Sequence, residues 1–422
     1  MRVERPGPDR RGVLVAGAAA ALAARPNPVR AAPHPGRTLS AARFGAVGDG
    51  IADDTKPLQA ALDASLRHGG TLLVIPPGTY RVTRTLRLMP NRSTTSDIGR
   101  HCGVLAHGAR LLSAITDGGN VLEVTSRATV RYVLIEGLDV LGTGKEGHGI
   151  VVACDRTDDY LYNFCLRDAV VQGCGRDGCR LVGNVFEGQI VDSYFRNNHG
   201  NGITLTNGTH GGILSAIHVF GAVCGNNGGH GAALMNGCYD VGFHGCYFLL
   251  NGQFGLAAGN GCTLLSNCGF ENNHAAAGAY AKGGAGIDLG SFGTLIGCTG
   301  YSRFYQNGLI RAFVTAPFVM VGCSGAGDGT ARDAGLARLA GTAAGEAVIV
   351  GCKGRIDYAP GFEALEIGGP DGGVRFGADW RSRYLPRLGE YRLWIDRAGR
   401  LRLKKGAPAA DDDGVPLGPQ AD

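Results

Sequence analysis

The sequence predicts an all-β protein built as a parallel β-solenoid, a chain whose coils stack one on another. Five glycines recur at near-regular intervals of 29, 24, 29 and 24 residues: Gly149, Gly178, Gly202, Gly231 and Gly255. The segments around them, including GRDGCRL, NNHGNGITL, NNGGHGAAL and LNGQFGLAA, align without gaps. Such a period is typical of coils that cannot close a hydrophobic core alone and must be covered by their neighbours.

Glycine content and strand pattern support the same fold. Glycine accounts for 72 of 422 residues, about 17% against an ordinary usage of roughly 7%. No Gly-X-Y period is present, so collagen is excluded. After each repeated glycine, alternate positions are apolar, as expected for side chains that point inward. These positions are Ile150, Val152, Cys179, Leu181, Ile203, Leu205, Ala232 and Leu234.

Three further sets of residues fall at matching places in successive coils. Asparagines precede the glycine-led strands and are expected to hydrogen-bond along a column: Asn198, Asn227, Asn251 and Asn273. Phenylalanines are expected to stack in the core: Phe195, Phe248 and Phe270. Five cysteines each follow an apolar strand and predict a column of buried thiols rather than disulfides: Cys246, Cys268, Cys298, Cys323 and Cys352.

Residues 1–35 are predicted to be an export signal and a Pro-rich linker. Arg10 and Arg11 precede an apolar run from Val13 to Ala24, similar to a twin-arginine signal and too short to span a bilayer. A periplasmic or secreted location follows; a disordered Ala-rich start is the alternative. The net charge is +5, and the Lys and Arg residues are scattered along the sequence. They form no basic stripe of the kind that binds nucleic acid. No other segment could span a membrane.

Both ends of the predicted solenoid carry a segment suited to cover it. Asp53, Asp54 and Thr55 are N-cap candidates for a helix whose apolar residues recur at helical spacing, and this helix is expected to cap the N-terminal end. Residues 36–355 are assigned to the solenoid and 356–422 to a C-terminal cap or tail. In that tail, EYRLWIDRAGRLRLKK reads as a β-hairpin.

The stretch from about Ala42 to Thr85 resembles a known family. FGAVGDG, then DDT, Gln59-Ala60-Ala61 and GGTLLVIPPGTY resemble the N-terminal signature of the pectate lyase superfamily. The resemblance implies a single-stranded right-handed parallel β-helix that acts on polysaccharides. Lyases, hydrolases, epimerases and phage-type depolymerases all share this signature, so it does not select the reaction. Trimers occur among similar depolymerases, which leaves a homotrimer open.

Aligning the coils places polar residues together beside the glycines. His148, Asp177, Asn201, His230 and Phe254 stand immediately before them, and Arg180 and Thr204 follow two positions after. Glu146, Arg176 and His199 lie slightly upstream. Since coils stack about 4.8 Å apart, this group is expected to form one patch with the carboxylates, imidazoles and guanidinium groups needed for sugar chemistry.

The leading hypothesis is β-elimination on a uronic-acid-containing polysaccharide. His199 or His230 would take the proton, Arg176 and Arg180 would hold the carboxylate, and Asp177 would orient a histidine such as His148. Asn201, Glu146, Thr204 and Phe254 would bind substrate. Two alternatives stay open: a hydrolase or glycosyl-transferring enzyme that uses Asp177 and Glu146 as its carboxylate pair, and a non-catalytic glycan-binding surface or adhesin.

Motifs for other chemistries are weak. Gly147-His148-Gly149 and Gly229-His230-Gly231 stand without the other polygalacturonase motifs, and an epimerase-type Tyr-Asp-Pro-His segment is missing. The sequence contains no CxxC pair with a histidine partner at the spacing of zinc ligands, so a zinc site is not predicted. No metal or cofactor is predicted, and Ca²⁺ is supported only by Asp155, Asp158 and Asp159.

Overall fold

A computed structural model describes residues 38–67, 71–90, 102–126, 128–258, 263–273, 287–289, 293–301, 310–314, 318–326, 336–341, 347–358, 364–368, 374–376, 387–388, 390–398 and 400–417. The predicted signal and linker, residues 1–35, lie outside this range. None of the helices in the described ranges is long and apolar enough to cross a membrane.

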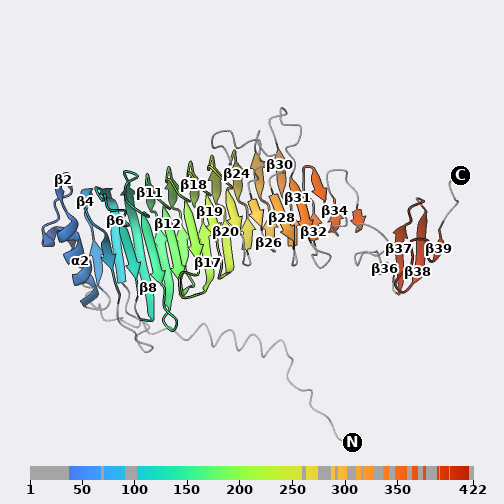
Figure 1. The fold of residues 1–422 in the computed structure, drawn as a ribbon, viewed down its shortest axis with the longest axis horizontal. Coiled ribbons are helices and arrows are strands. Elements are labelled where there is room, and N and C mark those ends of the chain that lie inside the picture. The colour runs from blue at the N-terminus through green and yellow to red at the C-terminus, as the bar shows by residue number, and fades with distance from the viewer. Residues whose placement is uncertain are drawn as a thin grey trace, which may run out of the picture. The chain divides into compact units, whose positions relative to one another are not determined.

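The predicted right-handed parallel β-helix is confirmed. Most coils contribute strands to three faces, here called face 1, face 2 and face 3, and strands of successive coils lie side by side in chain order (Figure 1). The 12-residue strands β6 (Cys102–Ser113) and β8 (Val130–Leu141) run through both face 1 and face 2.

Besides β6 and β8, face 1 contains β1 (Thr38–Ser40), β3 (Leu72–Val74), β10 (Leu161–Arg167), β13 (Val185–Phe186), β14 (Gln189–Val191), β17 (Leu214–Phe220), β20 (Cys238–His244), β23 (Thr263–Ser266), β26 (Gly293–Ile296), β29 (Phe318–Val321), β32 (Ala347–Val350) and β34 (Ala364–Ile367). Face 2 contains β2 (Asp49–Asp53), β4 (Gly78–Val82), β11 (Val170–Gln172), β15 (Tyr194–Arg196), β18 (Val223–Gly225), β21 (Tyr247–Leu249), β24 (Gly269–Glu271), β27 (Thr299–Tyr301) and β30 (Ser324–Ala326). Face 3 contains β5 (Leu86–Leu88), β7 (Leu122–Thr125), β9 (Ile150–Cys154), β12 (Cys179–Gly183), β16 (Ile203–Thr206), β19 (Ala232–Leu234), β22 (Leu256–Ala258), β25 (Ile287–Leu289), β28 (Ile310–Val314), β31 (Ala337–Gly341) and β33 (Ile356–Tyr358).

The core lies between the three faces and is built from stacked inward side chains. On face 1, register pairs Leu166 with Ile190, Val219, Phe243 and Leu265 in successive coils, and all five are fully buried. Burial of each such side chain stabilises the fold by about 1.5–3 kcal/mol. Because each coil covers the next, this apolar column holds the outer face in register.

The predicted asparagine column is confirmed at the turns between face 2 and face 3. Asn198 donates its Nδ2 hydrogen to Oδ1 of Asn227 at 3.0 Å, Asn227 donates to Asn251 at 2.9 Å, and Asn251 donates to Asn273 at 2.7 Å. All four side chains are at most 1% exposed. Their amides therefore satisfy polar groups that the buried turns would otherwise leave unpaired.

The predicted thiol column is also confirmed, and the phenylalanine stack is corrected in one place. The five cysteines are free and buried, and backbone bonds link the successive coils that carry them. Phe248 stacks on Phe270 with ring centroids 4.9 Å apart. Phe195 does not reach this stack, because the coil between them places Cys224 in the same column.

At the N-terminal end, η1 (Ala41–Phe44) precedes the predicted helix, α2 (Thr55–Arg67). Asp53 accepts a hydrogen bond from the Thr55 N–H at 3.1 Å, while the Asp54 carboxylate binds backward to the N–H groups of Val47 and Gly48. Leu58 and Leu62 are buried in the core cluster, and α2 contacts β1, β3 and β5, the first strands of faces 1 and 3. That α2 protects this end of the core stays a prediction.

The parallel coils continue beyond the predicted boundary at residue 355. β34 still pairs in parallel with β32, Ala347 opposite Ala364 and Val350 opposite Ile367, and only β35 (Val374–Phe376) runs antiparallel to it. No repeated glycine marks this last coil, and β34 has Glu366 opposite the buried Ile349, so the apolar pattern of the sequence does not predict it.

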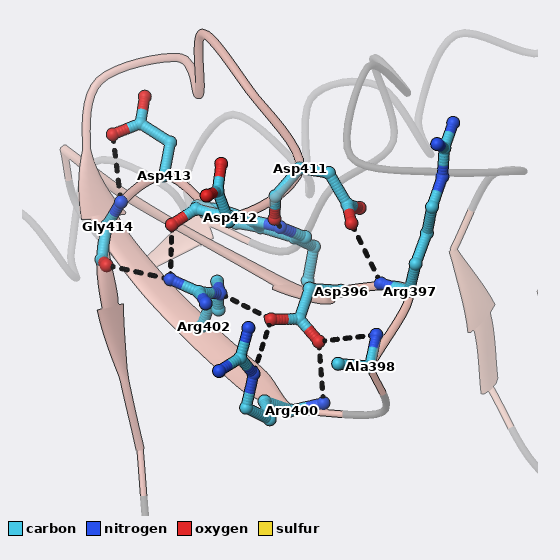
Figure 2. Close-up of polar contacts among 10 residues, drawn as sticks. Asp396, Arg397, Ala398, Arg400, Arg402, Asp411, Asp412, Asp413 and Gly414 are labelled. Carbon is cyan, nitrogen blue, oxygen red and sulfur yellow. Dashed lines mark hydrogen bonds and ion pairs between the residues drawn. The ribbon is translucent and has the colours of Figure 1, made fainter.

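The C-terminal residues form a separate four-stranded antiparallel sheet of β36 (Arg387–Leu388), β37 (Tyr391–Ile395), β38 (Leu401–Lys405) and β39 (Val415–Pro416). β37 and β38 are the two strands expected of the hairpin, with Ile395 opposite Leu401. Figure 2 shows how Asp396 organises the turn: its carboxylate accepts from the N–H groups of Ala398 and Arg400 and from the guanidinium groups of Arg400 and Arg402. Whether this sheet acts as a cap stays a prediction.

Candidate functional site

The residues that precede the repeated glycines lie in one column, as predicted. Register pairs Ile150 with Cys179, Cys179 with Ile203, Ile203 with Ala232, and Ala232 with Leu256 at the start of face 3. Each of these residues comes directly after a repeated glycine. The predicted residues His148, Asp177, Asn201, His230 and Phe254 are therefore one coil apart from their neighbours in the column.

These side chains form a ladder with the backbone of the next coil. The N–H of Asp177 donates to Nδ1 of His148 at 3.1 Å, that of Asn201 to Oδ1 of Asp177 at 2.9 Å, and that of His230 to Oδ1 of Asn201 at 2.7 Å. The N–H of Phe254 donates in turn to Nδ1 of His230 at 3.2 Å. Because a neutral imidazole has only one nitrogen lone pair, this bond occupies the lone pair that a general base would need. The ladder thus argues for a structural role of His148 and His230.

Asp177 is the most tightly held member of the column. Its Oδ2 lies 3.1 Å from Nη1 of Arg180 and 3.3 Å from Nδ1 of His148. Burial opposes its ionisation, but the adjacent His148 ring and the hydrogen bonds from the Asn201 N–H and the Thr204 hydroxyl outweigh this effect and lower the pKa of Asp177 to about 2. Arg180 is consequently engaged by a protein carboxylate rather than presented to a substrate.

Two predicted substrate-binding residues are corrected by their burial. Thr204 is 0% exposed and its hydroxyl accepts from Nδ2 of Asn201 at 2.9 Å. Glu146 is 3% exposed, and its carboxylate accepts from the N–H groups of Thr143, Gly144 and Gly175 and from the Ser113 hydroxyl. Neither group is accessible to a polymer. Polar residues at turns often serve the backbone in this way.

The same observations weaken the proposed carboxylate pair for hydrolysis. A glycosidase needs a general acid whose pKa is raised. Burial acts to raise the pKa of Glu146, yet its backbone hydrogen bonds lower it overall, and the pKa of Asp177 is lowered as well. Both carboxylates are therefore ionised at neutral pH.

Three predicted residues lie at the surface of the column. Arg176 and His199 are exposed, and the His199 ring lies so close to Gly144 that a Cβ there would come within 2.8 Å of its Cε1 atom. Phe254 stacks on His230 with ring centroids 5.5 Å apart and planes 8° apart. Of the predicted group, Arg176 and His199 present the most accessible polar side chains.

A groove on the outer surface of face 1 was not predicted. Its cavity of about 390 Å³ is floored by outward positions from five consecutive coils: Leu72, Gly103, Leu134, Cys165 and Gln189. Register joins these positions in one column, so the floor is about 19 Å long at the usual strand spacing. A long, shallow floor of this kind suits an extended polymer.

The walls of the groove carry polar side chains. On one side, a column of residues with left-handed backbone interrupts each strand, as in a β-bulge: Tyr132, Asn163, Glu187, Ala216 and Asp240, with φ between 49° and 60°. Tyr132 and Asn163 line the cavity. On the other side stands the exposed guanidinium group of Arg167, whose Nη1 is 3.9 Å from Oε2 of Glu136.

Two histidines lie on face 1 in the coils that follow the groove. His218 occupies the position next to Gln189 in the floor column, and Gly242 follows it. His244 lies beside them, two residues after Gly242, with Ser266 as its counterpart in the next coil. Nδ1 of His218 is 3.3 Å from Nε2 of His244, and Nδ1 of His244 is 2.8 Å from Oγ of Ser266.

An aromatic stack lies on the same face. Tyr162 and Phe186 are paired in adjacent coils with ring centroids 5.5 Å apart, and Tyr160 contacts both. The guanidinium carbon of Arg131 is 4.2 Å from the centre of the Tyr162 ring. Because Arg131 and Phe186 cover Tyr162 from the neighbouring coils, we interpret this stack mainly as packing along the coils.

The acidic group considered for Ca²⁺ is already used by the protein. Asp155 accepts from the N–H groups of Thr209 and His210, and Asp159 pairs with Arg156 at 2.9 Å. Within the described part of the chain, one other cluster brings metal-binding atoms within 4.8 Å of one another: His107, Glu136 and Asp168, from three consecutive coils. There Nε2 of His107 lies 3.0 Å from Oε1 of Glu136, so a hydrogen bond accounts for the proximity of these two side chains.

The face 1 groove was missed because its residues are not part of the repeated glycine motif. A usable signal did exist. Aligning the coils by Cys246 and Cys268 places His244 and Ser266, each two residues earlier, at the same position. The floor column has no shared residue type, so its members are brought together only by the strand register.

Three family descriptions match parts of the chain. Residues 39–95 match "Rhamnogalacturonase A/epimerase, pectate lyase-like", residues 121–298 match "Right handed beta helix region", and residues 364–419 match "Capsule depolymerase". The groove and the two histidines lie largely within the second match.

Individual relatives are polysaccharide epimerases and depolymerases. Mannuronan C5-epimerase AlgE5 of Azotobacter vinelandii is 27% identical over 239 residues, which cover 47% of this chain and 22% of the relative. A capsule KN3-specific depolymerase of Klebsiella phage KN3-1 is 31% identical over 130 residues, covering 31% and 14%. The chain thus spans less than a quarter of either relative.

A solved structure shares the fold. The A-module of mannuronan C-5 epimerase AlgE6 from Azotobacter vinelandii superposes with a TM-score of 0.53 at 16% identity, covering 78% of this chain and 98% of the module. At this identity the similarity establishes the architecture of the coils and not their chemistry.

Proposed function

We propose that this chain, a right-handed parallel β-helix protein of the pectate lyase-like type, is an exported enzyme that cleaves a uronic-acid-containing polysaccharide by β-elimination. The observation that carries the proposal is the face 1 groove, whose floor crosses five coils and whose edge presents Arg167. A polymer can lie along this floor, and a guanidinium group can pair with a uronate carboxylate in two parallel hydrogen bonds.

The chemistry requires removal of the C5 proton beside that carboxylate. Arg167 would stabilise the negative charge that develops on the carboxylate as the proton leaves. The relatives named as C5-epimerases support this substrate class, because inversion at C5 also breaks the C5–H bond. Elimination differs from epimerisation in the next step, when the C4–O4 bond breaks instead of C5 being reprotonated.

We also propose that no resident metal takes part, since Arg167 supplies the positive charge at the carboxylate. Treatment with a chelator should leave the rate unchanged. A loss of activity that Ca²⁺ or Zn²⁺ restores would instead direct attention to His107, Glu136 and Asp168.

The deciding experiment is incubation of the protein with polymannuronate, polygalacturonate, glucuronate-containing capsule polymers and a neutral glucan. Ultraviolet absorbance would report the unsaturated uronate, a reducing-end assay would report any cleavage, and proton NMR of the polymer would report epimerisation. We expect new absorbance and new reducing ends together on one of the uronates.

The other outcomes each select an alternative. Reducing ends without absorbance would establish hydrolysis and overturn the elimination. Altered C5 configuration without cleavage would establish an epimerase. Binding without any chemical change would leave a glycan-binding surface.

A further inference from the structure

His218, His244 and Ser266 form a connected chain of side chains at the end of the groove. The three come from consecutive coils, on strands β17, β20 and β23. The bond from Nδ1 of His218 to Nε2 of His244 is 3.3 Å, and that from Nδ1 of His244 to Oγ of Ser266 is 2.8 Å. Among the described residues, Nε2 of His218 is therefore the outer end of this chain.

Two neighbours hold the histidine pair in place. Phe220 stacks on His244 with ring centroids 4.8 Å apart and planes 18° apart. Gly242 lies beneath both rings: a Cβ there would come within 2.6 Å of Nε2 of His244 and 2.7 Å of Nδ1 of His218. Any larger residue at 242 would occupy the space that the His218–His244 bond requires. The His218–His244 contact therefore requires glycine at position 242.

The direction of the bond between His244 and Ser266 sets the tautomers of both histidines. Partial burial of His244, followed by repulsion from a charge on His218, lowers its pKa. A neutral His244 that donates from Nδ1 to Ser266 has its lone pair on Nε2, facing His218. His218 then carries its hydrogen on Nδ1, and its lone pair lies on Nε2. This is the tautomer that a general base needs, oriented by a second group as in other catalytic chains.

We propose that His218 is the catalytic base of this enzyme and that His244 and Ser266 are positioning residues that fix its tautomer. This rests on the proposed function for the identity of the substrate. The register places His218 one coil beyond Gln189 in the column that forms the groove floor, so a polymer that extends along this column past Gln189 would reach His218. The ladder at face 3 gives neither His148 nor His230 this freedom.

The step balances without another reactant. Nε2 of His218 takes the C5 proton, and the electron pair of the C5–H bond moves into the carboxylate as an enediolate. When the C4–O4 bond breaks, that pair forms the C4=C5 double bond and O4 leaves with the bonding electrons. The proton on Nε2 passes to the departing O4, which returns His218 to its starting state.

The first test measures the tautomer and needs no substrate. The full-length protein would be labelled with ¹⁵N at histidine, and the His218 and His244 signals would be assigned by comparison with H218Q and H244Q. We expect hydrogen on Nδ1 of both residues in wild type, and loss of this pattern for His218 in G242A. Hydrogen on Nε2 of His218 in wild type would overturn the proposal, whatever the enzyme's activity.

The second test measures kinetics on whichever uronate the wild type cleaves. General bases contribute about 10²–10⁴-fold, so H218A should lower kcat by that range with little change in KM. H244A should lower kcat about tenfold or more, and H244Q, whose amide oxygen can still accept from Nδ1, should retain more activity than H244A. His210, paired with Asp155 at a turn, provides the control variant H210A, which should match wild type.

The outcomes separate this inference from the proposed function. If wild type is silent on every uronate, the proposed function fails while the tautomer measurement still judges the histidine chain. If wild type is active and folded H218A matches it, the proposed function stands and His218 is not the base.

Discussion

The backbone N–H of Asn201 donates to Oδ1 of Asp177, 2.9 Å away and one coil earlier in the chain. The same carboxylate binds Arg180 and lies next to His148. These contacts stabilise the ionised form, so Asp177 contributes to folding and not only to the charge of the surface. Its effect on stability should therefore depend on pH in a defined direction.

The first prediction concerns this dependence. The pKa of Asp177 is lowered to about 2 in the folded protein, against about 3.9 in an unfolded chain. The stabilisation is complete above the unfolded value and is lost as pH falls through the folded value. Urea unfolding from pH 7 to pH 2 should show D177N less stable than wild type by about 2 kcal/mol at pH 7, with the difference shrinking towards pH 2.

Asp192, an exposed residue at a turn beside face 1, provides the control for that series. D192N should follow the wild-type curve throughout. A difference between D177N and wild type that stays constant from pH 7 to pH 2 would contradict the assignment of the effect to the Asp177 charge.

The second prediction concerns the asparagine column. Asn227 is 1% exposed, and its amide bonds to Asn198, Asn251 and the Phe195 carbonyl. N227A would leave several buried polar groups unpaired, each costing about 1–3 kcal/mol. We expect a loss of at least about 2 kcal/mol in the free energy of unfolding, while Q253A, at an exposed position of the next turn, should change it little. Equal stability of the two variants would show that the column is dispensable.

The third prediction concerns Arg167 at the groove edge. A hydrogen bond to a charged group contributes about 1.5–3 kcal/mol, so R167Q should lower kcat/KM on the uronate substrate by roughly ten- to a hundredfold. Arg196 lies on face 2, where its Nε donates to Gln172 at 3.2 Å. R196Q is therefore the matched loss of one exposed guanidinium group. If both variants lose activity equally, a general charge effect would replace the specific contact.

The fourth prediction uses Cys165, which lies in the groove floor and is partly exposed, unlike the other eleven described cysteines. Burial, opposed by Arg167, raises the pKa of its thiol, so alkylation should be slow at neutral pH and faster at alkaline pH. Mass spectrometry after brief native treatment should find Cys165 modified first. A uronate oligosaccharide should protect it, and C165A should remain active but insensitive to the reagent. Protection at the buried thiol column instead would contradict a groove on face 1.

Much of the fold could be predicted because the sequence repeats its physical constraints in every coil. Gly149, Gly178, Gly202, Gly231 and Gly255 mark the register of face 3, and the buried asparagines and cysteines mark two turns of the coil. Each such position faces the same surroundings in each coil, so the same residue type recurs. That periodicity is visible without coordinates.

The candidate site could be predicted only in part. Stacking of His148, Asp177, Asn201 and His230 followed from spacing, but the atoms that face one another did not. The structure shows backbone N–H groups occupying their side-chain acceptors, which a pattern of residue types cannot show. The sequence analysis also predicted that Glu146 and Thr204 would be exposed, whereas both are buried. The alternation of residue types along a strand distinguishes inward from outward side chains, but it does not show which outward side chains other parts of the protein cover.

The sequence by itself therefore determined the coil, its core and the alignment of successive turns, since these depend on local spacing and on inward apolar positions. Only the tertiary structure revealed the groove in which we propose that a polymer lies. The face 1 groove, Arg167 at its edge and the His218–His244–Ser266 chain join residues from different coils that share no motif. They are close because the parallel strands pair in a particular register. That register, and the contacts that follow from it, are known only from the structure.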